Sequence, residues 1–143
     1  MLSVEDRLAI QELYARYCWA IDTGDPDALV ATYTSDGAFE PPTGQVIAGH
    51  EALRTWAIAR AAFRKTEATT NGQHWSTNLV AEGDGVRAKA RCYFMRIAQK
   101  GDPMSVIFDV SGWQSDELRK IDGAWKFQSR KVSRNMPMHA AKA

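Results

Sequence analysis

Residues 73–81, QHWSTNLVA, mark the point at which the chain changes from helical to strand periodicity. From Gln73 onward, apolar and polar residues alternate with a period of two, which is typical of half-buried strands. Gly83-Asp84-Gly85 and Asp122-Gly123 are turn signals between such segments. We therefore expect a meander of four antiparallel strands, over residues 73–81, 86–98, 104–118 and 124–132.

The residues before this stretch predict helices. Ser3 and Asp6 have the spacing of a capping box, and the apolar residues after them recur at helical spacing, so a helix is expected over residues 4–21. Asp25-Pro26 begins a second, short helix that reaches Tyr33. Further elements are expected over residues 50–62, as a helix, and near 38–40 or 45–48, as a short strand. Three helices before a run of strands indicate an α+β domain, with the helices covering one face of a curved antiparallel sheet.

The length and the charge of the chain exclude several classes of protein. At 143 residues it is one domain, expected over residues 1–135 with a loose tail over 136–143, and too short for a two-domain cofactor enzyme. The 18 lysines and arginines nearly balance the 17 aspartates and glutamates, which leaves a net charge of +1. Such a chain has no field that would attract a polyanion, so we expect no nucleic-acid partner.

Motifs for membranes, metals and nucleotides are absent from the sequence. Residues 1–22 contain no long apolar run, so we expect neither a signal peptide nor a membrane span, and we expect a cytoplasmic protein. Cys18 and Cys92 stand apart from any His/Cys cluster, which argues against a disulfide framework and a metal site. The glycine-rich phosphate-binding loops are missing as well. We therefore expect no cofactor.

Asp22 and His74 are the candidates for proton chemistry. Asp22 lies near the end of the first helix, where the helix dipole disfavours an anion, so it is either a turn residue or a carboxylate that needs a partner. His74 shares a strand face with Ser76 and Asn78; it is either a structural histidine or a general base. A carboxylate on one ring nitrogen would fix the tautomer of such a base and stabilise its imidazolium. Sequence spacing alone does not establish that contact.

Tyr17 and Arg130 are weaker candidates. Tyr17 lies on the apolar stripe of the first helix, where it either packs its ring in the core or offers its hydroxyl to a pocket. Arg130 has the opposite strand parity to Trp125 and Phe127, so strict alternation turns it away from the helices. It reaches the interior only if a β-bulge near Ser129 shifts the register.

The chain from Ser3 to Asn135 resembles the SnoaL-like family of the nuclear transport factor 2-like superfamily. The motifs that carry this resemblance are Ile10-Gln11-Glu12-Leu13-Tyr14, Ala20-Ile21-Asp22, Asp27-Ala28-Leu29, Gly49-His50-Glu51-Ala52-Leu53, Gln73-His74-Trp75-Ser76-Thr77-Asn78 and Asp122-Gly123-Ala124-Trp125-Lys126-Phe127. It implies a cone-shaped α+β barrel with a pocket between helices and sheet.

The resemblance also implies roles for the candidate residues. Asp22 and His74 match the catalytic dyad of scytalone dehydratase, hexachlorocyclohexane dehydrochlorinase and bile acid 7α-dehydratase. Tyr17 matches a catalytic tyrosine of the bile acid enzyme, and Arg130 an active-site arginine of the dehydrochlorinase, which argues for the bulge. The residues that the resemblance places along the pocket, as substrate-binding, are Tyr14, Phe39, Trp56, Phe94, Phe108 and Gln114. One departure is clear: the second histidine of scytalone dehydratase is missing around Met95-Arg96.

These observations lead to one expected function and several alternatives. We expect a cofactor-independent lyase, a dehydratase or dehydrohalogenase, in which His74, oriented by Asp22, removes a proton from a hydrophobic cyclic small molecule. An isomerase or polyketide cyclase would use the same base, whereas a small-ligand binding domain or an oxygenase small subunit would use none. The open sheet face would expose Val86, Val110 or Trp113, so we expect a homo-oligomer, a trimer rather than a dimer.

Overall fold

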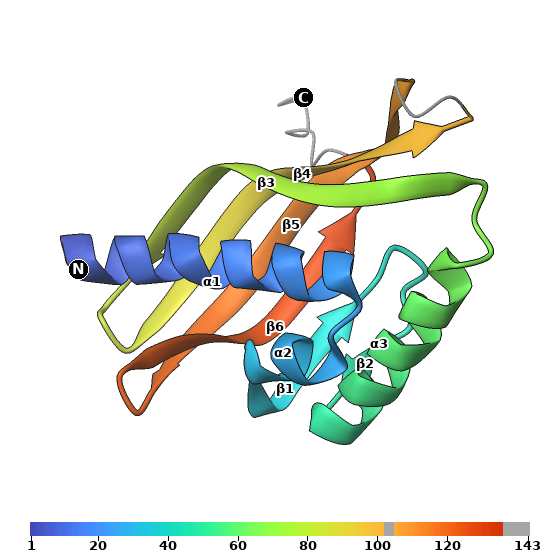
Figure 1. Cartoon of the computed structure of the whole chain (residues 1–143). Helices are drawn as coiled ribbons and strands as arrows, with labels where there is room; N and C mark the ends of the chain where they lie inside the picture. Colours follow the sequence, from blue (N-terminus) through green and yellow to red (C-terminus); the bar gives the residue numbers. More distant parts are fainter. Residues whose placement is uncertain (102–104, 136–143) are drawn as a thin grey trace, which may run out of the picture.

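Three helices pack on one face of a curled six-stranded sheet in the computed structural model, which describes residues 1–101 and 105–135 (Figure 1). The elements in chain order are α1 (Val4–Thr23), α2 (Pro26–Ala31), β1 (Tyr33–Glu40), β2 (Ile47–Ala48), α3 (His50–Arg64), β3 (Thr69–Gly83), β4 (Arg87–Lys100), β5 (Val106–Ile121) and β6 (Ala124–Ser133). The strand order is β2-β1-β6-β5-β4-β3. The predicted α+β class, with helices on one face of a curved sheet, is therefore confirmed.

The ends of the first two helices follow from local chemistry. Ser3 and Asp6 exchange side-chain to backbone hydrogen bonds, at 3.1 and 3.2 Å, and begin α1 as a capping box. Gly24 ends α1 in the left-handed conformation (φ 71°), which a residue with a side chain rarely adopts. Asp25 then caps α2, with Pro26 in its first turn. The expectation that this helix reaches Tyr33 is wrong, because Tyr33 pairs with Phe127 as the first residue of β1.

The sheet contains the predicted meander and one pairing that sequence did not indicate. Strands β3 to β6 are joined as consecutive antiparallel neighbours, as expected. Both short segments that were alternatives are strands, since Ala38 in β1 pairs with Ala48 in β2. Strand β1 runs parallel to β6, which makes the sheet mixed. Met104, where the third long strand was expected to begin, and the predicted tail over 136–143 lie outside the described residues.

Two β-bulges decide which side chains face the helices. In β6 the register moves by one residue, since Glu117 pairs with Ser129 but Leu118 pairs with Phe127. Phe127 and Arg130 are consequently both buried, although their positions differ in parity. The expected bulge near Ser129 is therefore present.

The second bulge lies in β5, opposite the end of β4. Arg96 pairs with Val110 whereas Ile97 pairs with Phe108, so Asp109 is the extra residue between them. The extra residue reverses the alternation of the strand and turns Phe108 away from the interior. None of the helices in the described part of the chain is long and apolar enough to cross a membrane.

Candidate active site

Asp22, at the end of α1, and His74, in β3, lie in direct contact although 52 residues separate them. His74 Nδ1 lies 2.6 Å from Asp22 Oδ1, and the His74 backbone N–H donates to Asp22 Oδ2 at 2.8 Å. Both side chains are largely buried, with 16% of Asp22 and 19% of His74 exposed. Two bonds to one carboxylate fix both the position and the ring orientation of the histidine.

The contact with Asp22 determines which ring nitrogen of His74 accepts a proton. An ionised carboxylate only accepts hydrogen bonds, so the 2.6 Å contact requires a proton on Nδ1. In the neutral ring, Nε2 then carries the lone pair. No described residue hydrogen-bonds Nε2, and His74 borders the interior cavity. Chemically, the pair is suited to remove a proton from a bound molecule.

Arg64, the last residue of α3, completes the surroundings of the dyad. Its Nη1 donates to the backbone oxygen of Ile21 and lies 3.8 Å from Asp22 Oδ1. Its Nη2 lies 3.4 Å from His74 Nδ1. That nitrogen has no lone pair to accept with when it donates to Asp22, so Arg64 acts on the dyad mainly through its charge.

The interior cavity has a volume of about 470 Å³ and one wall of mainly apolar side chains. The members of this wall come from α1, β1, α3, β4, β5 and β6: Tyr17, Ile21, Phe39, Trp56, Phe63, Phe94, Val110 and Val132. Phe39 and Trp56 pack with their ring centroids 4.8 Å apart. Gln114 also borders the cavity, and its Oε1 accepts from the Cys92 thiol at 3.1 Å, which leaves the amide N–H groups for a ligand. The structure thus places Phe39, Trp56, Phe94 and Gln114 along the cavity.

The cavity lining also contains charged residues, called the charged wall below, which the sequence did not indicate. Glu67 joins two arginines, with Arg60 Nη2 at 3.3 Å and Arg96 Nη2 at 3.0 Å from its carboxylate. Arg96 also donates through Nη1 to Asp109, the bulge residue of β5. Arg134 lines the same wall. The cavity is therefore amphipathic rather than uniformly apolar.

Arg130 lies in a closed layer behind the cavity. Its guanidinium donates to Asp116 at 3.1 and 2.8 Å, both side chains are fully buried, and Tyr14 donates its hydroxyl to the same carboxylate. The guanidinium carbon lies 4.2 Å from the ring centroid of Tyr17 and 3.9 Å from that of Phe127. Neither Arg130 nor Tyr14 lines this cavity, where both were expected, because both bind Asp116; Tyr14 instead borders a groove between α1 and β3 that His74 also lines.

Tyr17 does border the cavity and has its ring packed against Arg130. Burial raises the pKa of its hydroxyl, an effect that the nearby positive charge of Arg130 opposes only in part. Tyr17 therefore remains a protonated phenol at neutral pH. It can donate a hydrogen bond, but it is a poor base.

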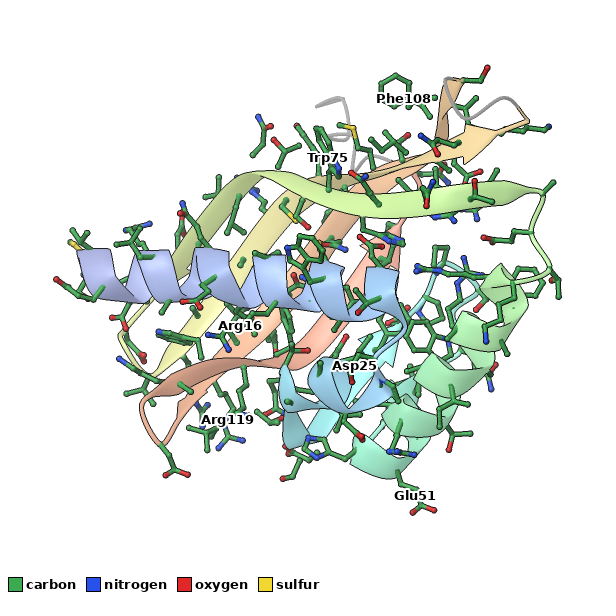
Figure 2. The ribbon with its side chains drawn as sticks, viewed as in Figure 1. Arg16, Asp25, Glu51, Trp75, Phe108 and Arg119 are labelled. Carbon is green, nitrogen blue, oxygen red and sulfur yellow. The ribbon has the colours of Figure 1, made fainter. Side chains whose placement is uncertain are left out.

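The prediction that Phe108 lines the pocket is wrong. Phe108 is 82% exposed and lies near the start of β5, far from α1 (Figure 2). The bulge at Asp109 is the physical reason, since it sends Asp109 and Val110 to the cavity and Phe108 to the outer face.

Comparisons with known proteins agree with this architecture. A family model described as a SnoaL-like domain matches residues 2–131. The chain belongs to the SnoaL-like domain family. No curated protein is significantly similar to it.

Several solved structures resemble this SnoaL-like domain. A Mycobacterium tuberculosis protein of unknown function is 35% identical, with 91% of this chain and 72% of that chain covered and a TM-score of 0.79. A Nostoc punctiforme protein of unknown function with a cystatin-like fold is 27% identical, with 94% of each chain covered and a TM-score of 0.78. A candidate scytalone dehydratase from Novosphingobium aromaticivorans is 18% identical, with 98% of this chain and 91% of that chain covered and a TM-score of 0.76. At this identity the likeness concerns the fold alone.

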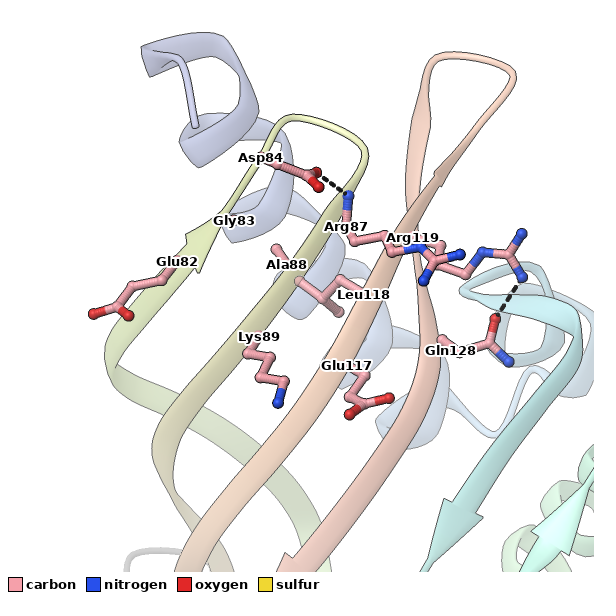
Figure 3. A pocket seen from close by; sticks show the side chains of 10 residues that line it. All are labelled: Glu82, Gly83, Asp84, Arg87, Ala88, Lys89, Glu117, Leu118, Arg119 and Gln128. Atoms are coloured by element: carbon pink, nitrogen blue, oxygen red, sulfur yellow. Dashed lines mark hydrogen bonds between the residues drawn. The ribbon is translucent and has the colours of Figure 1, made fainter. Parts of the chain in front are cut away.

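Besides the dyad cavity, the described residues of the SnoaL-like domain line several further hollows, among them two that border β3. One, of about 540 Å³, lies beside the β3–β4 turn and is lined by charged side chains such as Arg87 and Arg119 (Figure 3). There Asp84 accepts from the backbone N–H of Arg87 at 2.7 Å, and Arg119 donates to Gln128 at 3.1 Å. This hollow shares no residue with the dyad cavity. The other is a groove between α1 and β3 that His74 also lines.

Sequence reasoning missed Arg64, Arg96 and Asp116. Arg64 lies in the last turn of α3, where a cation is favoured by the helix dipole. Its position therefore gives no sign of a functional role. Asp116 offered a usable signal, because it shares strand parity with Gln114, which was expected in the pocket. A carboxylate on an inward strand face requires a buried partner, and that partner is Arg130.

Proposed function

We propose that this SnoaL-like domain is a cofactor-independent enzyme in which His74 removes a proton from carbon next to an activating group. The observation that carries this proposal is the 2.6 Å contact between Asp22 and His74 Nδ1, in a histidine that lines the cavity and whose Nε2 is left unbonded by the described residues. Asp22 fixes the acceptor tautomer and stabilises the imidazolium that forms on proton transfer. General base catalysis contributes about 10²- to 10⁴-fold to such reactions.

The proposed reaction is a β-elimination of water or halide. Nε2 takes the proton, the C–H electron pair forms the double bond, and the leaving group departs with its bonding pair. Tyr17 and Gln114 supply donors for the oxygen on which negative charge develops. An isomerase or a cyclase would share the first of these steps.

The two walls of the cavity suggest the shape of the substrate. The aromatic side chains of Phe39, Trp56 and Phe94 suit a flat apolar ring system. Arg60 and Arg134 on the charged wall suit a polar substituent at one end of it. We therefore propose a small cyclic substrate that is mostly apolar and carries a polar group.

A deuterium-exchange assay tests the proposed chemistry without the natural substrate. The probe is 2-tetralone, a bicyclic ketone with acidic C–H bonds beside its carbonyl, incubated in D₂O and analysed by mass spectrometry. The wild-type protein is expected to accelerate deuterium uptake beyond the buffer rate.

Asp22→Asn is expected to slow this uptake about 10²- to 10⁴-fold, because asparagine no longer holds the proton on Nδ1 of His74. Asp27→Asn is the matched control, since Asp27 lies on the surface in an ion pair with Arg54. An Asp22→Asn variant that exchanges deuterium at the wild-type rate would rule out the dyad.

We also propose that the protein is a homo-oligomer, a trimer rather than a dimer, that buries the outer face of β3, β4 and β5. Trp75 and Tyr93 are 52% and 47% exposed on adjacent strands there, and Tyr93 pairs directly with Trp113. Light scattering of the wild-type protein should give three times the chain mass. Tyr93→Arg should shift the protein toward monomers, because it places a charge within the apolar face. A monomeric wild-type protein would contradict this proposal.

A further inference from the structure

Arg64 contacts both members of the dyad without reaching the cavity. We propose that Arg64 is the positioning residue that keeps the Asp22 carboxylate oriented, so that His74 keeps its proton on Nδ1 and its lone pair on Nε2. This inference deepens the proposed function and rests on it for its role in catalysis. The effect of Arg64 on the His74 tautomer in the unliganded protein is expected whether or not the proposed function is correct.

The end of α1 needs a cation that α1 itself does not provide. Asp22 lies in the last turn, at the negative end of the helix dipole, and that turn contains no basic residue. Arg64 approaches from α3 and places its charge 3.8 Å from Asp22 Oδ1. Because both groups are mostly buried, the solvent screens this attraction only weakly.

The guanidinium is fixed by a bond that does not involve the dyad. Nη1 of Arg64 donates to the backbone oxygen of Ile21, the residue before Asp22. This bond ties the end of α3 to the end of α1. Nε of Arg64 is buried without a partner in the described part of the chain, a cost that the contacts of the other two nitrogens offset.

Other charged groups near His74 are already paired with one another. Arg96 is the cross-strand neighbour of His74, but Glu67 and Asp109 both bind its guanidinium. Arg64 is therefore the cation available to Asp22. Without it, the carboxylate would be oriented by His74 alone, and its preference for a proton on Nδ1 would weaken, so that the second neutral tautomer gains population.

Nitrogen NMR of the unliganded protein tests this inference directly. In the full-length protein labelled with ¹⁵N-histidine, the His74 signals are assigned by their loss in His74→Gln. We expect a single neutral tautomer with a protonated Nδ1 and an unprotonated Nε2. Arg64→Met should convert this state to a mixture of tautomers. The matched control is Arg54→Met, which removes an arginine of the same helix that pairs with Asp27 on the surface.

Arg64→Lys keeps the charge but loses the planar fork that reaches Ile21 and the dyad together. We expect this variant to retain more of the Nδ1-protonated form than Arg64→Met does, and it decides the question if Arg64→Met fails to fold. Wild-type tautomer populations in both variants would overturn the inference.

The exchange assay gives a second, independent readout. Arg64→Met should lower kcat for 2-tetralone exchange about 10- to 100-fold, as expected for a displaced base, and leave KM unchanged, because Arg64 does not border the cavity. If the wild type catalyses no exchange while the tautomers still depend on Arg64, the proposed function fails and the positioning role stands. A raised KM with an unchanged kcat would overturn the catalytic part of the inference.

Discussion

His74→Gln is expected to lower the rate of 2-tetralone deuterium exchange about 10²- to 10⁴-fold, since glutamine has no basic nitrogen to accept the proton. The fold should persist, because the His74 side chain is partly exposed and its hydrogen-bonding contacts within the described residues are with Asp22 and Arg64 alone. Thermal unfolding provides the check on folding. Gln73→Ala, a change at the neighbouring exposed residue, is the matched control and should exchange at the wild-type rate.

Chemical rescue separates a lost base from a disturbed site. His74→Ala leaves a space of about one imidazole ring beside Asp22, so added imidazole should restore part of the exchange rate and do nothing for His74→Gln. Rates that follow imidazole concentration only in the alanine variant would support proton transfer at this position. A His74→Ala variant with wild-type exchange in buffer alone would exclude His74 as the base.

Arg130→Met is expected to destabilise the folded state by about 3–5 kcal/mol, because it leaves the buried Asp116 carboxylate without its cation. Asp116 would retain only the Tyr14 hydroxyl as a side-chain partner within the described residues. Urea unfolding at neutral pH measures the loss. Lys131→Met, which removes an exposed cation from the next position, is the control and should cost less than about 1 kcal/mol.

The pair can also be removed as a unit. The double variant Arg130→Met with Asp116→Leu should regain much of the stability that either single change loses, since well-packed apolar side chains often replace a buried ion pair at little cost. The unpartnered Tyr14 hydroxyl limits the recovery. Losses that simply add in the double variant would show that the two residues do not form a coupled buried pair.

Local chemistry made much of this fold predictable. The capping box at Ser3 and Asp6 and the Asp25-Pro26 start lie within a few residues of what they determine, and alternation along residues 73–132 was enough for the meander. The parallel pairing of β1 with β6 was not predictable in this way. It depends on contacts between residues far apart in the chain, such as Tyr33 and Phe127.

Two β-bulges and ion pairs between residues far apart in the sequence account for most features of the site that were not predicted. One extra residue at Asp109 was enough to turn Phe108 outward, and one at Gln128 to turn Arg130 inward. Only the second was anticipated, and then through a family resemblance. The contacts of Arg64 with Asp22 and His74 join three separate elements, and no spacing rule connects them.

The central claim is that a proton-accepting Nε2 of His74 faces the bound ring, and a crystal structure with 2-naphthol, a stable mimic of the enol form of 2-tetralone, tests it most directly. We expect the rings to lie against Phe39, Trp56 and Phe94, with the hydroxyl oxygen or its neighbouring ring carbon within about 3.5 Å of Nε2. The Nδ1 contact with Asp22 should be retained. Naphthol bound in the groove between α1 and β3 or in the hollow beside the β3–β4 turn, with the dyad cavity unoccupied, would contradict the claim.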